Sequence, residues 1–531
     1  MAPRTVTVRP GSSTQADARS ARRAESGSAS RDRPLVVVSN REPYQHSHHP
    51  DGSIVASPTT GGVAVALDAL MRERGGVWIA HGSGDADREV VDENDRVGVP
   101  TDQPGYLLRR LWLTEGEALQ YYEGFSNEGL WPLCHEAHVR PVFRTPDWEA
   151  YQRVNARFAD VIESELPDPT VPVFIQDYHL ALVGAKLRRR QPGVKTAIFW
   201  HIPWPSPDRL RICPWRRELL EGLLGNDLIA FQLDRDRRNF LTAAREDFGL
   251  DVTRNTVRRG NRIIAVKAVP IGVDYDRIQQ ITQDPTLDEE MARLRQELGL
   301  DTPYIGIGVD RLDYTKGVLE RLEAIERLFE QRADLRDSLT FVQIGVPSRS
   351  SLRSYVDVVE AIDRKVADIN ARYGSGRGAI RYRKSAFRIR RLVALYRLAN
   401  FCVVSSLHDG MNLVAKEFVA ARQDDDGALV LSEMAGAAQQ LHDALIINPY
   451  DVDGFAAAIG QAIDMSHAER RRRMHAMRRV VAGRNIFGWA SDILADLEKL
   501  DPRALPPHPG RAEANVERAI ARKVRNRDDP K

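Results

Sequence analysis

Short runs of β-branched and other apolar residues alternate with longer helical patterns along most of the chain. The runs show no polar–apolar alternation, which is typical of strands that are buried on both faces of a parallel sheet. Helical patterns lie between them, for example over residues 148–165 and 181–190. We therefore predict an α/β protein with parallel sheets. The first series of predicted strands covers residues 34–39, 173–175, 197–200, 228–231 and 263–266, and the second covers 304–309, 339–344, 401–404 and 445–447.

The two series of strands predict two domains. A chain of 531 residues is longer than a typical single domain. We place the first α/β domain at residues 34–268 and the second at 269–484. One more helix is predicted over residues 485–500, before a proline-rich stretch. Residues 1–33 and 501–531 are expected to be disordered tails, the second of them basic.

Charge is distributed unevenly along the chain. The net charge is +2, but residues 1–33 and 503–531 each carry +4, which leaves −6 for the part between them. A mildly acidic core with short basic tails gives no support for nucleic acid as a partner. No apolar run approaches the ~18 residues that span a bilayer, so no membrane partner is expected either. The three cysteines have no C-x-x-C spacing and no secretory signal is evident, which favours a cytoplasmic protein.

Residues 402–418 carry the most informative pattern. Residues 402–404 form a short apolar strand, residues 405–410 are polar, and the spacing becomes helical from Met411 onward. A strand–loop–helix unit directs backbone N–H groups and the positive end of the helix dipole into a crevice, where a diphosphate can bind. Asp409 in the loop and Glu417, about two helical turns later, suit the hydroxyl groups of a sugar and a ribose. The alternative is an ordinary α/β turn with solvated acids.

A second pattern lies at residues 308–317. Arg311 and Lys316 follow a predicted strand and precede a helix. Open α/β sheets bind ligands at this end of their strands. Two cations there can hold a diphosphate and stabilise the charge that grows on it as a bond to a sugar breaks. Cations are disfavoured near a helix start, so a merely structural role as surface cations is the weaker interpretation.

Further candidates follow other strands or open other helices. Gly61 and Gly62 precede a helical stretch, so their N–H groups can approach a phosphate, although most glycine pairs only mark tight turns. Tyr122 and Trp131 stand among polar residues, which favours a pocket wall over a position in the core. The remaining candidates beyond predicted strands are Arg41, Asp177, His201 and Arg349.

These segments resemble retaining glycosyltransferases of the GT-B class, and the trehalose-6-phosphate synthase family in particular. The acid-x7-acid spacing is similar to that of the class, and D-G-M-N-L-V-A-K-E and R-L-D-Y-x-K-G are similar to family motifs. Y-Y-x-x-F-S-N-x-x-L-W-P, D-Y-H-L and H-I-P occur in the family order as well, so the resemblance covers about residues 34–500. It implies two Rossmann-like domains that face a cleft, with the helix at 485–500 crossing back to the first domain.

The resemblance also implies a reaction and an acceptor site. The expected reaction transfers glucose, with retention, from a nucleoside diphosphate glucose to glucose 6-phosphate and gives α,α-trehalose 6-phosphate. An arginine fork and a phenol suit a dianionic phosphate. The acceptor-binding residues implied are Arg41, Tyr122, Trp131, Asp177 and Arg349, and Trp131 and Ile202 are expected to select the anomer.

For the donor, the resemblance implies a larger set of residues. Phe387 resembles the position that offers its backbone to the nucleobase. The catalytic residues implied are Asp177, His201, Arg311, Lys316 and Asp409. The nucleotide-sugar-binding residues implied are Gly61, Gly62, His201, Arg311, Lys316, Phe387, Asp409, Leu413, Val414, Ala415, Lys416 and Glu417.

We expect neither a metal nor another cofactor, because the nucleotide sugar is a co-substrate. The motifs present no evident nucleophile opposite the leaving group, so we hypothesise departure and attack on one face, with Arg311 and Lys316 in place of a metal. Asp274 and Asp276 form a D-x-D pair, but it follows a turn between the domains and has no supporting carboxylates. The histidines of the loop at 42–60 lack a fourth zinc ligand at a recognisable spacing.

Two alternatives stay open from the sequence. A glucosylglycerol-phosphate synthase would use the same scaffold with a smaller acceptor, and a regulatory subunit would sense sugar phosphates without catalysis. Intact Arg311, Lys316, Asp409 and Glu417 argue against the regulatory subunit. The base of the donor is also open (uridine, adenosine or guanosine), since Gln176 stands where the family usually has His and His408 where Arg is common. A homo-oligomer is a weak expectation from the family.

Overall fold

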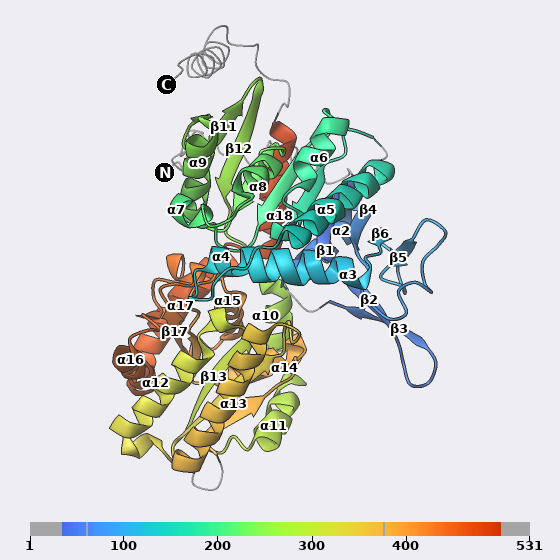
Figure 1. The fold of residues 1–531 in the computed structure, drawn as a ribbon. Coiled ribbons are helices and arrows are strands. Elements are labelled where there is room, and N and C mark those ends of the chain that lie inside the picture. Colours follow the sequence, from blue (N-terminus) through green and yellow to red (C-terminus); the bar gives the residue numbers. More distant parts are fainter. Residues whose placement is uncertain (1–33, 60–61, 167, 375–377, 501–531) are drawn as a thin grey trace, which may run out of the picture.

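The computed structural model describes residues 34–59, 62–166, 168–374 and 378–500. The two predicted tails and Gly61 lie outside the described residues. Figure 1 shows two α/β halves, one above the other, each built on its own sheet. The architecture is the α/β class that the buried strands predict.

The first sheet contains ten strands among the described residues, in the order β10-β11-β12-β9-β8-β7-β1-β4-β6-β5. Neighbours from β12 to β6 run parallel, and β5, β11 and β10 pair antiparallel at the two edges. The strands are β1 (Leu35–Arg41), β4 (Gly76–His81), β5 (Arg96–Val99), β6 (Tyr106–Leu111), β7 (Val173–Gln176), β8 (Thr196–Trp200), β9 (Leu228–Phe231), β10 (Asp251–Val252), β11 (Thr256–Arg259) and β12 (Arg262–Ala268).

The second sheet has six described strands, all parallel, in the order β15-β14-β13-β16-β17-β18. Four of them are the predicted ones, and β15 and β17 are additional. Their bounds are β13 (Tyr304–Arg311), β14 (Leu339–Val346), β15 (Ile380–Arg383), β16 (Phe401–Val404), β17 (Ala428–Ser432) and β18 (Leu445–Ile447).

Both faces of each sheet are buried, as the uninterrupted apolar runs predict. In β1, Val36 and Val38 face one apolar cluster, while Leu35 and Val37 face the other. The helices that cover the sheets or connect their strands are α2 (Gly62–Arg74), α3 (Glu115–Ala118), α4 (Trp131–His135), α5 (Thr145–Glu165), α6 (Val183–Arg190), α7 (Pro207–Leu210), α8 (Arg216–Leu223), α9 (Asp234–Phe248), α10 (Tyr275–Gln283), α11 (Leu287–Leu298), α12 (Val318–Gln331), α13 (Arg353–Tyr373), α14 (Ile389–Leu398), α15 (Leu413–Ala421), α16 (Val452–Asp464), α17 (His467–Ala482) and α18 (Ile486–Lys499).

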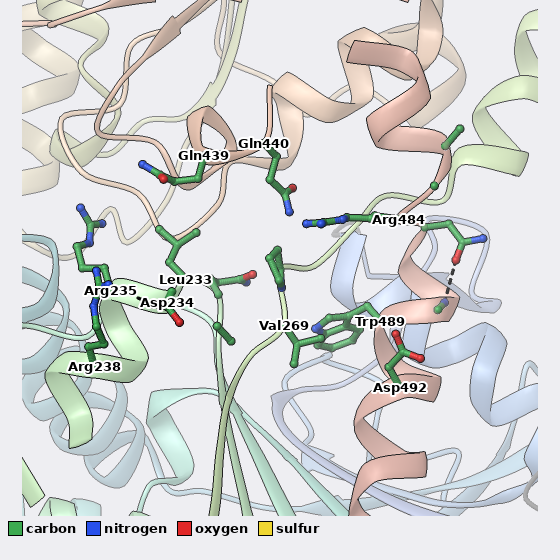
Figure 2. A pocket seen from close by; sticks show the side chains of 17 residues that line it. Leu233, Asp234, Arg235, Arg238, Val269, Gln439, Gln440, Arg484, Trp489 and Asp492 are labelled. Atoms are coloured by element: carbon green, nitrogen blue, oxygen red, sulfur yellow. Dashed lines mark hydrogen bonds and ion pairs between the residues drawn. The ribbon is translucent and has the colours of Figure 1, made fainter. Parts of the chain in front are cut away.

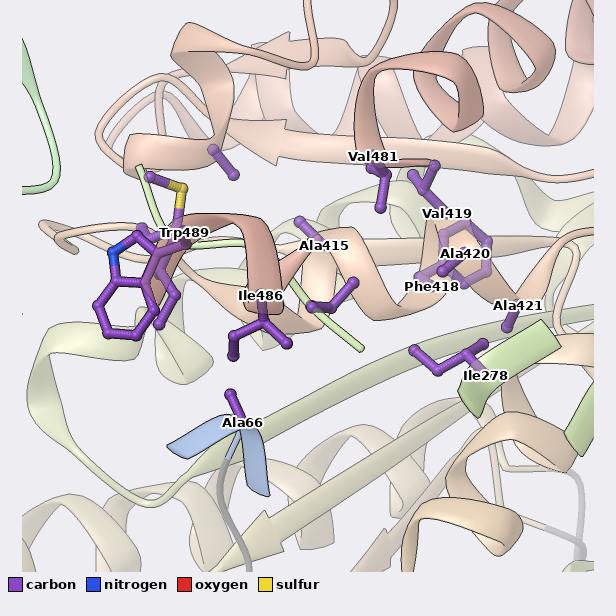
Figure 3. Close-up of a cluster of buried hydrophobic side chains, with 14 of the residues drawn as sticks. Ala66, Ile278, Ala415, Phe418, Val419, Ala420, Ala421, Val481, Ile486 and Trp489 are labelled. Atoms are coloured by element: carbon purple, nitrogen blue, oxygen red, sulfur yellow. The ribbon is translucent and has the colours of Figure 1, made fainter. Parts of the chain in front are cut away.

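The chain passes between the two halves twice. It leaves the first sheet at the end of β12 and returns after α17, so that α18 packs against α2 and β8. The Trp489 ring lies 5.8 Å from that of Phe174 and 4.8 Å from that of Phe199. Figure 3 shows Trp489 and Ile486 beside apolar residues of α15 and α17 from the second half and Ala66 of α2 from the first. One apolar cluster therefore joins both halves, although the domain limits at 268 and 484 stay a prediction.

The histidine-rich loop forms a hairpin of β2 (Tyr44–His48) and β3 (Ile54–Pro58). A buried arginine fastens the hairpin to the first sheet. The Arg110 guanidinium donates to His46 Nδ1 at 2.8 Å and pairs with Asp87 at 2.7 Å and with Glu42 at 3.1 Å. His46 is thus engaged by a cation, which disfavours zinc binding at this nitrogen.

Between the halves, the segment η1 (Leu119–Leu130) is a π-helix that continues into α4. The π-helix is a rare conformation, and it is frequently found at functional sites. Among the described residues, no helix combines the length and the apolar character that crossing a bilayer requires.

Candidate active site

A cavity of about 460 Å³ lies between the two halves, at the carboxyl ends of strands from both sheets. Ligands bind at this end of open parallel sheets. Most of the predicted catalytic and acceptor-binding side chains meet here from segments far apart in the sequence. Those that line the cavity are Arg41, Tyr122, Trp131, Asp177, His201, Ile202, Arg311, Lys316, Arg349, Asp409 and Leu413.

One corner of the cavity is strongly positive. Arg41, at the end of β1, donates to the Tyr122 hydroxyl at 2.9 Å. Burial alone would raise the pKa of the Tyr122 phenol, but the positive charges of Arg41 and Arg349 outweigh it and lower that pKa to about 8. Two guanidinium groups and one phenol therefore face the same small volume, which suits a doubly charged phosphate.

The position of Arg349 is set by several contacts. Its backbone has a φ of 50°, which is uncommon for a residue other than glycine. The guanidinium lies 3.6 Å from Asp313 and donates to the Tyr178 hydroxyl at 3.2 Å. It also stacks over the Trp131 ring, 4.1 Å from the ring centre. These contacts hold the charge in the cavity before any ligand arrives.

Asp177 occupies a strained position directly after β7. Its φ of 73° is costly for a residue with a side chain, and such strain concentrates at functional sites. The carboxylate accepts backbone hydrogen bonds from Tyr178 at 2.9 Å and from His201 at 3.1 Å. Burial raises the pKa of Asp177 to about 6, although both bonds and the nearby arginines act in the opposite direction. The free oxygen is thus available to hydroxyl groups in the cavity.

His201 is held as a neutral imidazole. Burial lowers its pKa to about 3. Its Nε2 lies 3.0 Å from Gln176 Oε1, within hydrogen-bond distance. Gln176, which stands where the family usually has His, thereby orients the His201 ring.

Lys316 and Arg311 form a second positive group in the lining of the cavity. Lys316 Nζ lies 2.6 Å from Asp409 Oδ2. Burial would raise the pKa of the Asp409 carboxyl, but Lys316 lowers it to about 2. Arg311, at the end of β13, lies over the Trp131 ring at 5.2 Å from its centre. Trp131 therefore lies within contact distance of both Arg311 and Arg349.

The start of α15 also faces the cavity. Asn412 caps this helix with a φ of 72°, and its side chain accepts from the Ala415 N–H at 3.2 Å. Met411, Asn412 and Leu413 line the cavity. The helix N-terminus and its dipole are thus directed at the region beside Lys316, where an anion is favoured.

Other residues predicted for the nucleotide sugar have side chains that do not line this cavity. Lys416 turns away and donates to the Ile271 carbonyl between the two halves, and burial lowers its pKa to about 7. Glu417 lies 3.3 Å from the Tyr396 hydroxyl, and burial raises its pKa to about 7. Phe387 lies under the Arg391 guanidinium, 4.5 Å away. Val414 and Ala415 are likewise absent from the lining, and Gly61 lies outside the described residues.

Several lining residues carry no role in the sequence-based prediction. His135, one turn after Trp131, stacks on its ring at 3.9 Å between centres, and the i, i+4 spacing within W-P-L-C-H was the available signal. Ile271 and Gln232 line the cavity from the chain crossing and from the end of β9. Nothing local in the sequence marks these two, because their position depends on how the halves meet.

In the part of the chain that the structure describes, no group of three or more His, Cys, Asp or Glu side chains is arranged to hold a metal ion. Asp274 of the D-x-D pair instead caps α10, accepting from the Arg277 N–H at 3.0 Å. The absence of a metal requirement stays a prediction.

The family comparison agrees with this site. The sequence profile of glycosyltransferase family 20 matches residues 33–499. The chain belongs to glycosyltransferase family 20. A trehalose-6-phosphate synthase of Mycobacterium avium (strain 104) is 38% identical over 479 residues, which cover 88% of this chain and 96% of the relative. The similarity to this family that the motifs predict is confirmed, as is the prediction of a glycosyltransferase enzyme.

Solved structures agree with the two-domain arrangement. One from E. coli, described as bound with UDP-2-fluoro glucose, is 33% identical and superposes with a TM-score of 0.79, covering 88% of this chain and all of its own. An α,α-trehalose-phosphate synthase (UDP-forming) from Burkholderia xenovorans, in complex with glucose-6-phosphate, is 32% identical with a TM-score of 0.77 over 88% of this chain and 100% of that one. The predicted GT-B fold, two Rossmann-like domains facing a cleft, is confirmed.

Proposed function

We propose that this chain is a trehalose-6-phosphate synthase that transfers glucose from a nucleoside diphosphate glucose to glucose 6-phosphate, with retention at the anomeric carbon. One observation carries the proposal. A positive corner formed by Arg41, Tyr122 and Arg349 and a second cationic group formed by Arg311 and Lys316 share one cavity of about 460 Å³. The first suits a phosphate monoester and the second a diphosphate, which are the charged parts of the two substrates.

We propose that the acceptor binds along the first domain. Arg41, Tyr122 and Arg349 hold its phosphate, and Asp177 accepts from its sugar hydroxyls. Trp131 and Ile202 shape the space around the anomeric carbon. The complex of the Burkholderia xenovorans relative with glucose-6-phosphate supports this ligand class.

We propose that the donor lies against the second domain. Arg311 and Lys316 bind its diphosphate at the N-terminus of α15, and Asp409 accepts from the glucose hydroxyls. Lys316 and Asp409 form an ion pair in the structure, so the incoming diphosphate competes with Asp409 for Lys316. The nucleoside portion extends past Leu413 toward Glu417 and the backbone near Phe387.

The chemistry follows from this placement. The bond between the glucose anomeric carbon and the diphosphate oxygen breaks, and negative charge grows on that oxygen next to Arg311 and Lys316. Such preorganised cations stabilise a transition state by several kcal/mol and can do so without a metal. The acceptor hydroxyl attacks from the same face, and its proton passes to the departing phosphate oxygen. His201, neutral because burial lowers its pKa to about 3, contributes a hydrogen bond rather than a charge.

The test is an end-point assay with purified protein, glucose 6-phosphate and UDP-, ADP- or GDP-glucose in parallel, with EDTA present. We expect trehalose 6-phosphate without added metal, and the best donor identifies the base. Nucleotide release with glycerol 3-phosphate alone would favour a glucosylglycerol-phosphate synthase. Binding of both ligands without any turnover would favour a regulatory subunit. A homo-oligomer and a cytoplasmic location remain expectations.

A further inference from the structure

A second cavity, larger than the first at about 900 Å³, lies where the chain crosses between the two halves. Its walls come from the start of α9, the end of β12, the segment after β17 and the start of α18. Figure 2 shows Arg235 and Arg238 on one side, Arg484 on the other, and the Gln440 amide directed toward the space beside Arg484. None of these residues takes part in the proposed reaction.

The lining is polar and carries three arginines against two aspartates. Asp234 is already paired, with Arg237 at 2.7 Å and with Arg238 at 3.2 Å. Arg484 is exposed at the mouth, and its side chain makes no hydrogen bond or ion pair to another described residue. Asp492 is the remaining acid and lies beside Trp489 in Figure 2. At the Arg484 side the cavity therefore presents a guanidinium group that no described carboxylate neutralises.

Two buried N–H groups in the same lining have no partner. Gln440 is 9% exposed and Trp489 is 3% exposed, yet Gln440 Nε2 and Trp489 Nε1 have no hydrogen-bond acceptor among the described residues. A buried donor without an acceptor has lost its hydrogen bonds to water and gained none in return, so such groups need an explanation. Arg484 also lies near enough to Lys416 to add to the burial that lowers the Lys416 pKa to about 7. A bound anion with oxygen acceptors would satisfy the donors and offset this repulsion.

We propose that this cavity is a second binding site for a small phosphate ester that carries several hydroxyl groups. Arg484 binds its phosphate, Gln440 and Trp489 donate to its oxygens, and Asp492 accepts from a hydroxyl. Sugar phosphates and nucleotides both have this chemistry, and the volume admits either. Shared walls connect the site to the active-site cavity: Gln232 lines both, and Trp489 lies 5.9 Å from the His201 ring.

The test is isothermal titration of the full chain with ribose 5-phosphate and, separately, with AMP, in the parent chain and in Arg349→Ala, which lacks one arginine of the positive corner of the active-site cavity. We expect one binding event, and the tighter of the two probes distinguishes a sugar phosphate from a nucleotide. Arg484→Gln removes a charge-assisted hydrogen bond and is expected to weaken binding about tenfold. Arg479→Gln, an exposed arginine on α17 outside the cavity, is the matched control and should bind as the parent chain does.

Two results would overturn the second site. One is no binding of either probe to the parent chain, and the other is an Arg484→Gln variant that binds as tightly as the control. Arg349→Ala separates this proposal from the proposed function. Loss of probe binding in that variant would place the probe in the active-site cavity and contradict the second site. Probe binding that persists in Arg349→Ala but weakens in Arg484→Gln would support the second site, whether or not the parent chain forms trehalose 6-phosphate.

Discussion

Lys316 Nζ and Asp409 Oδ2 lie 2.6 Å apart, although 93 residues separate them in the sequence. Each follows a strand of the second sheet, Lys316 after β13 and Asp409 after β16, and these strands are direct neighbours. The loops after adjacent parallel strands meet at one edge of a sheet, so the two residues form one charged unit. In the proposed reaction that unit opens when the diphosphate takes Lys316 and the sugar takes Asp409.

Removing one partner of this pair should destabilise the fold. The side chains of Lys316 and Asp409 are only 11% and 13% exposed, so Lys316→Met leaves a buried carboxylate without its cation. We expect a loss of about 3 kcal/mol in the free energy of unfolding in urea at pH 7. Lys384→Met is the control, because Lys384 pairs with Asp363 at the surface. This variant should lose less than ~1 kcal/mol in the free energy of unfolding.

The pH dependence of that loss follows from the pKa of Asp409. Lys316 lowers this pKa from 3.8 to about 2, so the ion pair stabilises the fold above pH 3.8 and its contribution disappears as the pH falls toward 2. The difference in the free energy of unfolding between Lys316→Met and the parent chain should therefore be smaller at pH 3 than at pH 7. An equal difference at both pH values would show that the pair does not stabilise the fold through charge.

Tyr122 should make acceptor binding sensitive to alkaline pH. Its phenol has a pKa of about 8, because Arg41 and Arg349 outweigh the effect of burial. Above pH 8 the phenol ionises, repels a dianionic phosphate and competes for both guanidinium groups. We expect the dissociation constant of glucose 6-phosphate, measured by titration calorimetry, to rise by about tenfold between pH 7.5 and pH 9. The reason is that only about a tenth of the phenol remains protonated one pH unit above its pKa.

The matching variant is Tyr122→Phe. It should bind glucose 6-phosphate more weakly at pH 7, because one donor is lost, but with little change up to pH 9. If the affinity of the variant for glucose 6-phosphate still fell about tenfold up to pH 9, another group would be responsible and the assignment to Tyr122 would be wrong.

Arg311 should matter mainly for turnover. It lies at the end of β13, where we propose that charge grows on the departing diphosphate. Arg311→Ala is expected to lower kcat by ~10²-fold or more, as for other preorganised groups that stabilise a developing anion. Arg353→Ala, with a side chain 81% exposed on α13, should retain full activity. A loss below threefold in Arg311→Ala would exclude this role.

His408 links the donor loop to the first domain. Its Nδ1 lies 2.6 Å from the His135 carbonyl, and its Nε2 lies 3.2 Å from the Arg235 guanidinium. His408→Ala removes both contacts beside Asp409 and should lower kcat/KM for the donor about tenfold, since two hydrogen bonds contribute ~1 kcal/mol or more together. His442→Ala, an exposed histidine of the same domain, is the control. Unchanged kinetics in His408→Ala would mean that the bridge is only structural.

The strands that the sequence predicts are those with uninterrupted apolar runs, because burial on both faces leaves that pattern. β17 (Ala428–Ser432) carries the same signal and was equally predictable. β15 (Ile380–Arg383) was harder to predict, because this edge strand has only four residues, I-R-Y-R, and therefore no uninterrupted apolar run. The length and pairing of the antiparallel edge strands likewise depend on their neighbours rather than on local composition.

The candidate site divides in a similar way. Residues at a strand end, such as Arg311, or directly after one, such as Asp177, were predictable because strand ends converge in an α/β sheet. The motif at 413–417 does not indicate which of its side chains face the cavity. Successive side chains on a helix point about 100° apart, and of these five residues only Leu413 lines the cavity. Lys416 contacts Ile271, 145 residues away, a contact that depends on how the two domains meet.

The most direct test of the central claim is a proton NMR time course of the purified chain with glucose 6-phosphate and its best nucleotide-glucose donor, in EDTA. The account predicts that one disaccharide phosphate forms at the rate of nucleoside diphosphate release, with both anomeric protons in the α configuration. A product in which the transferred glucose is β-linked would contradict the proposed departure and attack on the same face of that sugar. Donor hydrolysis without transfer to glucose 6-phosphate would contradict the acceptor site built from Arg41, Tyr122 and Arg349.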